Sequence, residues 1–346
     1  WILSTVAHAV TILIVKKKAI QKMYTGAELL QQVEQALAAL PYDRIPQRLY
    51  DPVRYVLSLG GKRVRPVLML LAYNLYKEDV ASIMSVALGV ETYHNYTLLH
   101  DDVMDRAEVR RGRPCVHKVW NENTAILSGD SMLVMAYQLV AQCPEEYLKK
   151  IMDLYTATAL EIGEGQQYDV DFENRMDVRP EEYIEMIRLK TSVLLACAVK
   201  MAAVQAGAPA EECDLLYRFG ESVGLAFQLQ DDMLDVYGDF ETFGKKIGGD
   251  ILCNKKTYLL IKALEGANEE QRAELESWIN ATEYDPEEKI SAVTRLYNEI
   301  GVRTVCQDLV NKYFEDARLY LEQVSLPAEK KAPLWEYALS LLGRKN

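Results

Sequence analysis

The sequence has no closely spaced cysteines. Its 346 residues include six, and no two stand at the short spacing of a zinc site or a redox pair. Scattered cysteines in a chain of this length are typical of reduced core residues, so we expect a reducing compartment and a cytoplasmic location. The six are Cys115, Cys143, Cys197, Cys213, Cys253 and Cys306.

Positive charge is in the minority. Lysine and arginine number 39 against 51 aspartates and glutamates, which gives a formal net charge of −12. We therefore expect no nucleic acid as a partner, because proteins that bind it present an excess of positive charge. The acidic balance does not exclude small anions, because a local group of cations can bind them with the help of a metal ion.

Strand-like alternation of apolar and polar residues is scarce, and no Pro-, Gly- or Ser-rich linker divides the chain. Apolar residues instead recur every three or four positions, which is the spacing of a helix. Residues 192–206 are apolar on nearly all sides, as in the centre of a bundle. We predict an all-α fold, a single large helical bundle. The predicted helices cover residues 27–40, 65–79, 81–105, 124–141, 146–169, 180–206, 211–236, 257–264, 269–284, 286–319 and 332–342.

The first 22 residues differ from the rest. About fifteen apolar residues, WILSTVAHAVTILIV, precede three lysines. The run is short for a membrane span, and a secretory signal carries its positive charge before the apolar run. The chain begins with Trp1, and Met23 stands just before the first helical pattern. We expect an extension outside the fold over residues 1–22, no stable membrane insertion, and one domain over residues 23–346; a membrane anchor is the alternative.

Aspartates occur twice with the spacing D-D-x-x-D, and each group ends an apolar helix. On a helix the first and last of each trio lie one turn apart, where two carboxylates repel each other unless a cation lies between them. Paired carboxylates suit Mg²⁺, which binds a few of them together with phosphate oxygens and water. One group alone could be a solvated helix face, but two together predict a magnesium site. The aspartates are Asp101, Asp102, Asp105, Asp231, Asp232 and Asp235.

Cations accompany both acidic groups. Arginine binds phosphate oxygens with a planar fork, and lysine binds them as a point charge. Lys62, Arg63 and Arg65 alone could belong to a basic loop at a helix entrance, but together with the other cations and the aspartates they predict a cavity for diphosphates and Mg²⁺. His94, two turns before Asp101, is better placed to contact a diphosphate than to be a core residue; His100 is expected to be structural, and His117 stays undecided. The cations are Lys62, Arg63, Arg65, Arg110, Arg111, Lys190, Lys245 and Lys246.

Five motifs resemble, in order, those of the trans-isoprenyl diphosphate synthases, the polyprenyl synthetase family. They are GGKRVRP, ETYHNYTLLHDDVMDRAEVRRGRP, EGQQYDV, KTSVLL and FQLQDDMLDVYGDFETFGKKIGGD, and the likeness extends over residues 27–345. The resemblance implies the isoprenoid synthase fold, a homodimer with one central active-site cavity per subunit. It also implies an enzyme that condenses isopentenyl diphosphate with allylic diphosphates (dimethylallyl, geranyl or farnesyl) by ionisation, condensation and elimination.

The same resemblance implies roles for single residues. The reaction that it implies needs no nucleophilic serine or cysteine. Three Mg²⁺ ions would be bound by Asp101, Asp105, Asp231 and Asp235, the last directly or through water, with Asp102 in support. Isopentenyl diphosphate would be held by Lys62, Arg65, His94 and Arg111, and the allylic diphosphate by Arg110, Lys190 and Lys245. The allylic cation would be lined by Thr191 and Gln228, which we count with Lys190 as catalytic residues.

In the family that the chain resembles, an aromatic residue before the first aspartate group limits product length. The family rule points to Tyr96, five residues before Asp101, with the small Thr97 next to it and no two-residue insertion in the motif. On a helical wheel Tyr93 lies about 80° from Asp101 and Tyr96 about 140°, which favours Tyr93 as the pocket floor. Either aromatic predicts a short-chain product, and we favour C20 over C15.

Two rival interpretations share part of this pattern. A class I terpene cyclase is also a helical bundle with metal-triggered ionisation, but it usually lacks GGKRVRP and a second intact D-D-x-x-D. A non-catalytic regulatory subunit would commonly lose an aspartate motif or a substrate-binding cation. This chain carries all of them, so we expect an active enzyme.

Overall fold

A computed structural model describes residues 21–238 and 247–342 and confirms the all-α prediction. A short antiparallel hairpin of two two-residue strands, β1 (Val109–Arg110) and β2 (Arg113–Pro114), is the only sheet in this described part of the chain. The helices are α2 (Gly26–Ala38), α3 (Gln47–Ser58), α4 (Val64–Asn74), η1 (Val80–Ile83), α5 (Met84–Met104), α6 (Val116–Val119), α7 (Glu122–Val140), α8 (Glu145–Glu173), α9 (Pro180–Ile187), η2 (Arg188–Ser192), α10 (Val193–Ala206), α11 (Ala210–Tyr237), α13 (Gly249–Leu252), α14 (Tyr258–Gly266), α15 (Glu269–Asn280), α16 (Pro286–Ile300), α17 (Val302–Gln323) and α18 (Ala328–Leu342).

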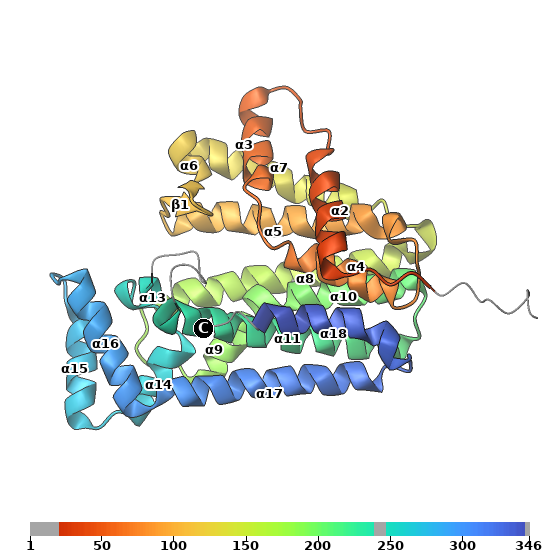
Figure 1. Cartoon of the computed structure of the whole chain (residues 1–346). Helices are drawn as coiled ribbons and strands as arrows, with labels where there is room; N and C mark the ends of the chain where they lie inside the picture. The colour runs from red at the N-terminus through yellow and green to blue at the C-terminus, as the bar shows by residue number, and fades with distance from the viewer. Residues whose placement is uncertain (1–20, 239–246, 343–346) are drawn as a thin grey trace, which may run out of the picture.

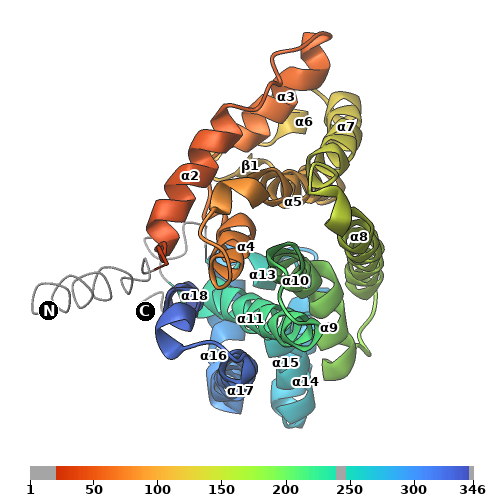
Figure 2. The ribbon, with the colours of Figure 1, turned by 90° about the vertical axis from the view of Figure 1, so that its right-hand side faces the viewer.

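The helix predicted to be apolar on nearly all sides lies at the centre of the molecule. Twelve of the fourteen residues of α10 are buried. Figures 1 and 2 show α10 and α11 between α5 and α8 on one side and α17 on the other. Apolar residues pack into two clusters, one around α4, α5 and α10 and one around α11, α14 and α17. Burial of these faces supplies most of the free energy that holds such a bundle together.

Two helices predicted as continuous are divided in the structure. The predicted helix 180–206 is interrupted by a π-helical turn, η2. The predicted helix 286–319 is two helices, α16 and α17, which meet at Gly301, whose φ is 83°. Glycine adopts this left-handed conformation without the steric cost that a Cβ brings, so it ends α16 and starts α17. Helix α3 was not predicted, and Pro52 stands inside it.

The start of α2 follows from its sequence. Thr25 accepts a hydrogen bond from the backbone N–H of Glu28, and the Glu28 side chain accepts from the backbone of Thr25, which forms a capping box. Just before it, Gln21 donates to the carbonyl of Asn74 at 2.7 Å, and the Asn74 side chain donates to the carbonyl of Lys22 at 3.0 Å. The rest of the expected N-terminal extension lies outside the described residues.

The cysteines are free, as expected, and all but Cys253 are buried. Of the helices in the described ranges, none combines the length and the apolar character that a membrane span requires. Lys245, predicted to bind the allylic diphosphate, and its neighbour Lys246 lie outside those ranges.

Candidate active site

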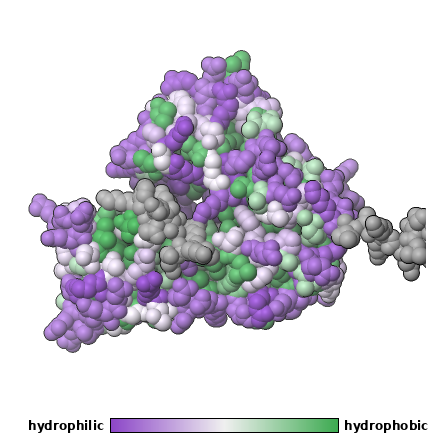
Figure 3. Space-filling view, in the orientation of Figure 1, coloured by the Kyte–Doolittle hydropathy of each residue, from purple (hydrophilic) through white to green (hydrophobic). Residues whose placement is uncertain are grey.

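The two aspartate groups lie at the C-terminal ends of α5 and α11, as their spacing predicted. Burial raises the pKa of Asp101, and the neighbouring Asp105 carboxylate raises it further, whereas the Lys190 ammonium opposes both effects. Burial also raises the pKa of Asp105, and Lys190 again opposes the shift. The face of the molecule seen in Figure 1 is hollowed between the part that contains α3 and α5 and the part that contains α11 (Figure 3).

Lys190 joins the first aspartate group to a second acidic helix. It lies in the π-helical turn η2, where an extra residue per turn shifts the side-chain positions. Its Nζ lies 2.7 Å from Oδ2 of Asp169 on α8 and 3.9 Å from Oδ2 of Asp101. Asp169 belongs to the EGQQYDV motif, but the sequence reasoning gave it no role.

A second lysine, which sequence reasoning missed, lies where the acidic groups converge. Lys255 follows α13, and burial alone would lower its pKa. The carboxylates around it outweigh that effect and raise the pKa above its ordinary value. They come from α13, α8, α11 and the residue that follows α5, and are Asp250, Asp169, Asp232 and Asp105. Lys255 therefore shows that both aspartate groups face one region. The sequence offered only a KK pair without acidic neighbours.

The middle aspartate of the second group is buried and bonded. Asp232 accepts a short hydrogen bond from the Tyr183 hydroxyl on α9 and one of 3.0 Å from the Gln228 amide. Burial, followed by the nearby Asp250 carboxylate, raises the pKa of Asp232. The Thr191 hydroxyl donates to the amide oxygen of Gln228 at 3.2 Å. The two residues predicted to line the cation are therefore neighbours, tied to the second aspartate group.

The last aspartate of the second group orients the segment that leads to Lys255. Oδ2 of Asp235 accepts from the backbone N–H of Asp250 at 2.9 Å, and its carbonyl accepts from Gly248 at 2.6 Å. Asp235 is 7% exposed. At least one of its oxygens thus serves the chain itself, and the contact of Asp235 with a metal ion, directly or through water, stays a prediction.

Cationic side chains crowd around His94 on α5. Burial lowers the pKa of His94 well below its ordinary value, and the guanidinium groups of Arg65 and Arg111 lower it further. Burial and Arg111 also lower the pKa of Arg65 to about 10, and its Nε is buried without a hydrogen-bond partner among the described residues. Crowded cations repel one another unless an anion lies among them. The group therefore fits a bound diphosphate.

A buried arginine holds the glycine-rich loop beside this group. Arg63 has a left-handed φ of 46° and is 2% exposed. Its Nε lies 2.7 Å from Glu34 on α2, and its Nη1 lies 2.9 Å from Glu91 on α5. Arg63 thus positions the flanking cations of GGKRVRP, while its own charge is matched by two carboxylates.

The loop is also tied to Arg111 and to the C-terminal helix. Arg111 donates to the carbonyl of Gly60, and a Cβ at Gly61 would lie 2.9 Å from the Arg111 guanidinium carbon. A larger residue here would displace the Arg111 guanidinium, and the φ of 136° itself favours glycine at position 61. The carbonyl of Lys62 accepts from Tyr337 on α18 at 3.4 Å.

Arg110 lies between the cations and the first aspartate group. Its Nε donates to both oxygens of Asp102 at 2.9 Å, and its Nη2 donates to Oδ1 at 2.7 Å. Asp102 is 5% exposed, so the pair is largely removed from water and geometrically fixed. Asp102 therefore orients Arg110, a role that the sequence did not predict, and its support of Mg²⁺ binding stays a prediction.

The donors present fit Mg²⁺. They are carboxylate oxygens, which Mg²⁺ prefers, and burial with like charge disfavours the ionised forms of Asp101 and Asp105 until a cation is added. In the part of the chain that the structure covers, no three carboxylate, histidine or cysteine side chains converge on one metal position. The donor set suits a metal ion that completes its shell with phosphate oxygens and water.

Aromatic rings pack against one another on α5, one to two turns before the first aspartate group, and against α8. Tyr93 is 3% exposed, and its hydroxyl donates to the carbonyl of Ala159 at 3.2 Å. Its ring centroid lies 5.4 Å from Tyr96 and 5.6 Å from Tyr155 on α8. Tyr96, half buried, also contacts His100 with centroids 4.9 Å apart. Both predicted length-determining residues therefore belong to one aromatic cluster.

The chain matches one protein family over most of its length. The profile of the family described as polyprenyl synthetase matches residues 46–298. A geranylgeranyl diphosphate synthase from Methanosarcina mazei is 37% identical over 286 residues, which cover 82% of this chain and 86% of that protein. A geranylfarnesyl diphosphate synthase from Natronomonas pharaonis is 35% identical over 330 residues, covering 86% of this chain and 94% of that protein.

Solved structures share the fold. A crystal structure of a geranylgeranyl pyrophosphate synthase superposes with a TM-score of 0.86 at 44% identity, covering 94% of this chain and 100% of the other. A geranylgeranyl pyrophosphate synthetase from Pyrococcus horikoshii superposes with a TM-score of 0.85 at 30% identity, covering 92% and 98%.

Proposed function

The chain belongs to the polyprenyl synthetase family, and we propose that it condenses isopentenyl diphosphate with an allylic diphosphate to give a short-chain trans-prenyl diphosphate. The observation that carries the proposal is the convergence at Lys255 and Lys190. These two lysines bring carboxylates of both aspartate groups into one region beside a separate group of crowded cations. One enzyme thus offers two anion sites, as a condensation of two diphosphates requires.

The allylic diphosphate takes the site between the aspartate groups. Lys190, Lys255 and Arg110 supply cations there, and Lys245 is the remaining expected contact. Mg²⁺, three ions per site, supplies electrostatic stabilisation of the leaving diphosphate when bound to Asp101, Asp105 and the second aspartate group. The ion pairs of Lys190 with Asp169 and of Arg110 with Asp102 hold these two cations in place before the substrate binds. Little reorganisation therefore accompanies the development of charge on the leaving diphosphate.

Isopentenyl diphosphate takes the site made by Lys62, Arg65, His94 and Arg111. The low pKa of His94 keeps its imidazole neutral, so it can donate one hydrogen bond without adding to the crowded positive charge. Arg65 and Arg111 supply planar donors that match phosphate oxygens. This arrangement holds the double bond of isopentenyl diphosphate next to the allylic carbon, which favours attack once the C–O bond breaks.

The allylic cation lies against oxygen atoms of this chain. The Thr191 hydroxyl and the Gln228 amide oxygen are 3.2 Å apart, and both carry partial negative charge without acting as nucleophiles. The bond from Thr191 to Gln228 and the bond from Gln228 to Asp232 limit the side-chain motion that would let them react or reorient. The proton lost in the final step goes to the departing diphosphate.

The product is short, with C20 favoured over C15. The elongating chain extends toward Tyr96, Tyr93 and Tyr155, whose rings contact one another edge to face. Aromatic rings packed in this way resist displacement by a growing apolar chain. The geranylgeranyl synthases among the similar proteins agree with C20, although a relative named for geranylfarnesyl diphosphate shows that the family also makes a longer product.

A homodimer is the proposed assembly, in a reducing, cytoplasmic compartment that suits six free cysteines. Apolar side chains on α7 and α8 are exposed in the single chain, among them Leu127, Val134 and Leu160 at 59%, 59% and 72%. Exposed apolar groups of this kind mark contact surfaces. Light scattering should give twice the chain mass for the wild type and a smaller mass for Leu127→Arg. An unchanged mass in the variant would count against this face.

Substitution of one aspartate in each group tests the proposed site. Asp101→Ala and Asp231→Ala should each lower turnover by more than a hundredfold with little loss of helicity, because each removes charge that acts in the transition state. Asp308→Ala, on an exposed face of α17, is the matched control and should keep full turnover. Full turnover in both site variants would refute the proposed site.

A further inference from the structure

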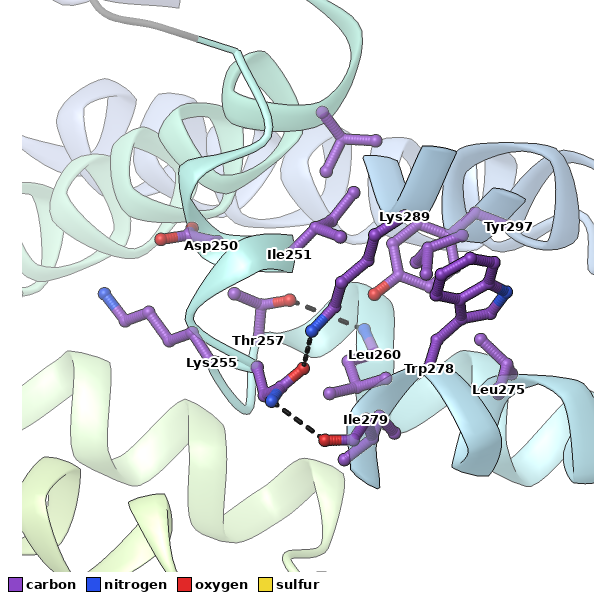
Figure 4. Close-up of a pocket in the computed structure, with 13 residues that line it drawn as sticks. Asp250, Ile251, Lys255, Thr257, Leu260, Leu275, Trp278, Ile279, Lys289 and Tyr297 are labelled. Atoms are coloured by element: carbon purple, nitrogen blue, oxygen red, sulfur yellow. Dashed lines mark hydrogen bonds between the residues drawn. The ribbon is translucent and has the colours of Figure 1, made fainter. Parts of the chain in front are cut away.

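The loop that carries Lys255 is fixed by side-chain hydrogen bonds on the face opposite the acidic site. Asn254, the residue before it, has a left-handed φ of 52°, and the loop joins α13 to α14. Figure 4 shows Lys255 and Lys289 on opposite sides of this loop, with Lys255 near Asp250 and Lys289 near Tyr297. The loop therefore has one face toward the acidic site and one toward α15 and α16.

The rear face is fixed by one asparagine side chain. Its Oδ1 accepts from Nζ of Lys289 on α16 at 2.7 Å, and its Nδ2 donates to the carbonyl of Ile279 on α15 at 3.0 Å (Figure 4). Both hydrogen-bonding groups of the Asn254 amide are therefore used, each by a different helix. Asparagine also tolerates the left-handed backbone better than most residues, so the position suits both demands.

Lys289 is an unusual buried cation. It is 1% exposed, and burial lowers its pKa. Its Nζ lies 4.3 Å above the Tyr284 ring, and the Asn254 amide oxygen is its hydrogen-bond partner. A buried ammonium is costly unless it makes such contacts, so the α15–α16 pair strongly favours the one loop conformation that supplies the amide oxygen.

The space around these residues is too small for a substrate. The cavity lined by Lys289, Trp278 and Tyr297 has a volume of about 20 Å³, which is room for about one water molecule. The contacts at this place therefore serve the loop and not a second ligand.

We infer that Asn254 and Lys289 are positioning residues that hold Lys255 among the carboxylates of the allylic diphosphate site. The inference rests on the proposed function, because it assigns Lys255 to the allylic site. Loss of either side chain frees the loop on its rear face, and Lys255 then occupies its place among the four carboxylates for only part of the time. The side chains proposed for the isopentenyl diphosphate site come from other segments: the loop before α4, helices α4 and α5, and the β1–β2 turn.

Three variants test the inference in the full-length protein. Asn254→Gly keeps the left-handed φ and removes both side-chain bonds, while Lys289→Met removes only the ammonium. Asn254→Asp keeps the acceptor for Lys289 and should recover much of the loss. Lys312→Met, exposed on α17, is the matched control. Thermal unfolding by circular dichroism checks that each variant folds.

The readouts separate positioning from stability. In Asn254→Gly and Lys289→Met, we expect about a tenfold rise in KM for the allylic substrate and in the Kd of an allylic thiolodiphosphate, which does not ionise. The KM for isopentenyl diphosphate should stay within about twofold. Lower kcat with both KM values and the Kd unchanged would show a purely structural role and overturn the inference, as would full wild-type behaviour. Absence of elongation by the wild type would instead refute the proposed function.

Discussion

The ammonium nitrogen of Lys190 lies 2.7 Å from Oδ2 of Asp169, so the π-helical turn η2 is fixed to α8 beside the first aspartate group. Lys190→Met removes this cation and keeps a side chain of similar length. We expect kcat to fall about a hundredfold, because a preorganised charge near the leaving group is lost. Lys149→Met, whose exposed lysine pairs with Asp153, should leave kcat unchanged. A kcat within threefold of the wild type would remove Lys190 from the catalytic residues.

His94 makes the stability of the fold depend on pH. Its pKa in the folded chain lies well below the unfolded value of about 6.5, so the unfolded chain binds more protons between the two values. The neutral His94 therefore makes its full contribution to the free energy of unfolding above a pH of about 6.5. That contribution is lost as the pH falls toward the pKa of His94 in the folded chain. The midpoint of thermal unfolding should therefore fall more steeply between pH 7 and pH 5 in the wild type than in His94→Gln. Parallel curves would contradict the burial of a neutral imidazole.

The aromatic cluster should determine product length. Tyr96→Ala removes a ring that contacts Tyr93, so products longer than C20 are expected from farnesyl diphosphate. Tyr93→Phe is the control, because it removes only the hydroxyl that donates to Ala159. Chromatography of the dephosphorylated products gives the chain length. Longer products from Tyr93→Ala but not from Tyr96→Ala would assign the floor to Tyr93.

Arg63 should contribute to stability rather than to substrate binding. Arg63→Met leaves Glu91, which is 1% exposed, without its cation. Breaking a buried pair in this way costs about 3 to 5 kcal/mol of unfolding free energy. Arg54→Met, at a pair that is partly exposed, should cost less than about 1 kcal/mol. Urea unfolding measures both, and equal losses in the two variants would contradict the role given to Arg63.

Helix periodicity and aspartate spacing predicted much of this molecule. The all-apolar pattern of residues 192–206 placed α10 at the centre, and the two D-D-x-x-D groups predicted carboxylates at the ends of α5 and α11. Both signals are local, because they follow from 3.6 residues per turn. Lys255 and Asn254 gave no local signal. Apart from Asp250, five residues before Lys255, their partners come from the end of α5 and from α8, α11, α15 and α16, and only the packing of these helices brings them together. The roles given to the aspartates and cations stay predictions.

The divided helices show the same limit. The π-helical turn at Lys190 leaves no mark in an apolar pattern that continues on both sides of it. Gly301 was visible in the sequence, but a single glycine inside a helical pattern is often tolerated. Such a glycine ends a helix only where the fold requires the chain to turn. In this fold the chain turns at Gly301, between α16 and α17.

One measurement tests the central claim most directly. The full-length protein is incubated with Mg²⁺, labelled isopentenyl diphosphate and each allylic primer in turn, and the products are dephosphorylated and sized by chromatography. The account predicts a C20 alcohol as the main product, and none when the metal is chelated. No elongated product from any primer would contradict it, because the intact aspartate groups and cations would then serve something other than prenyl transfer.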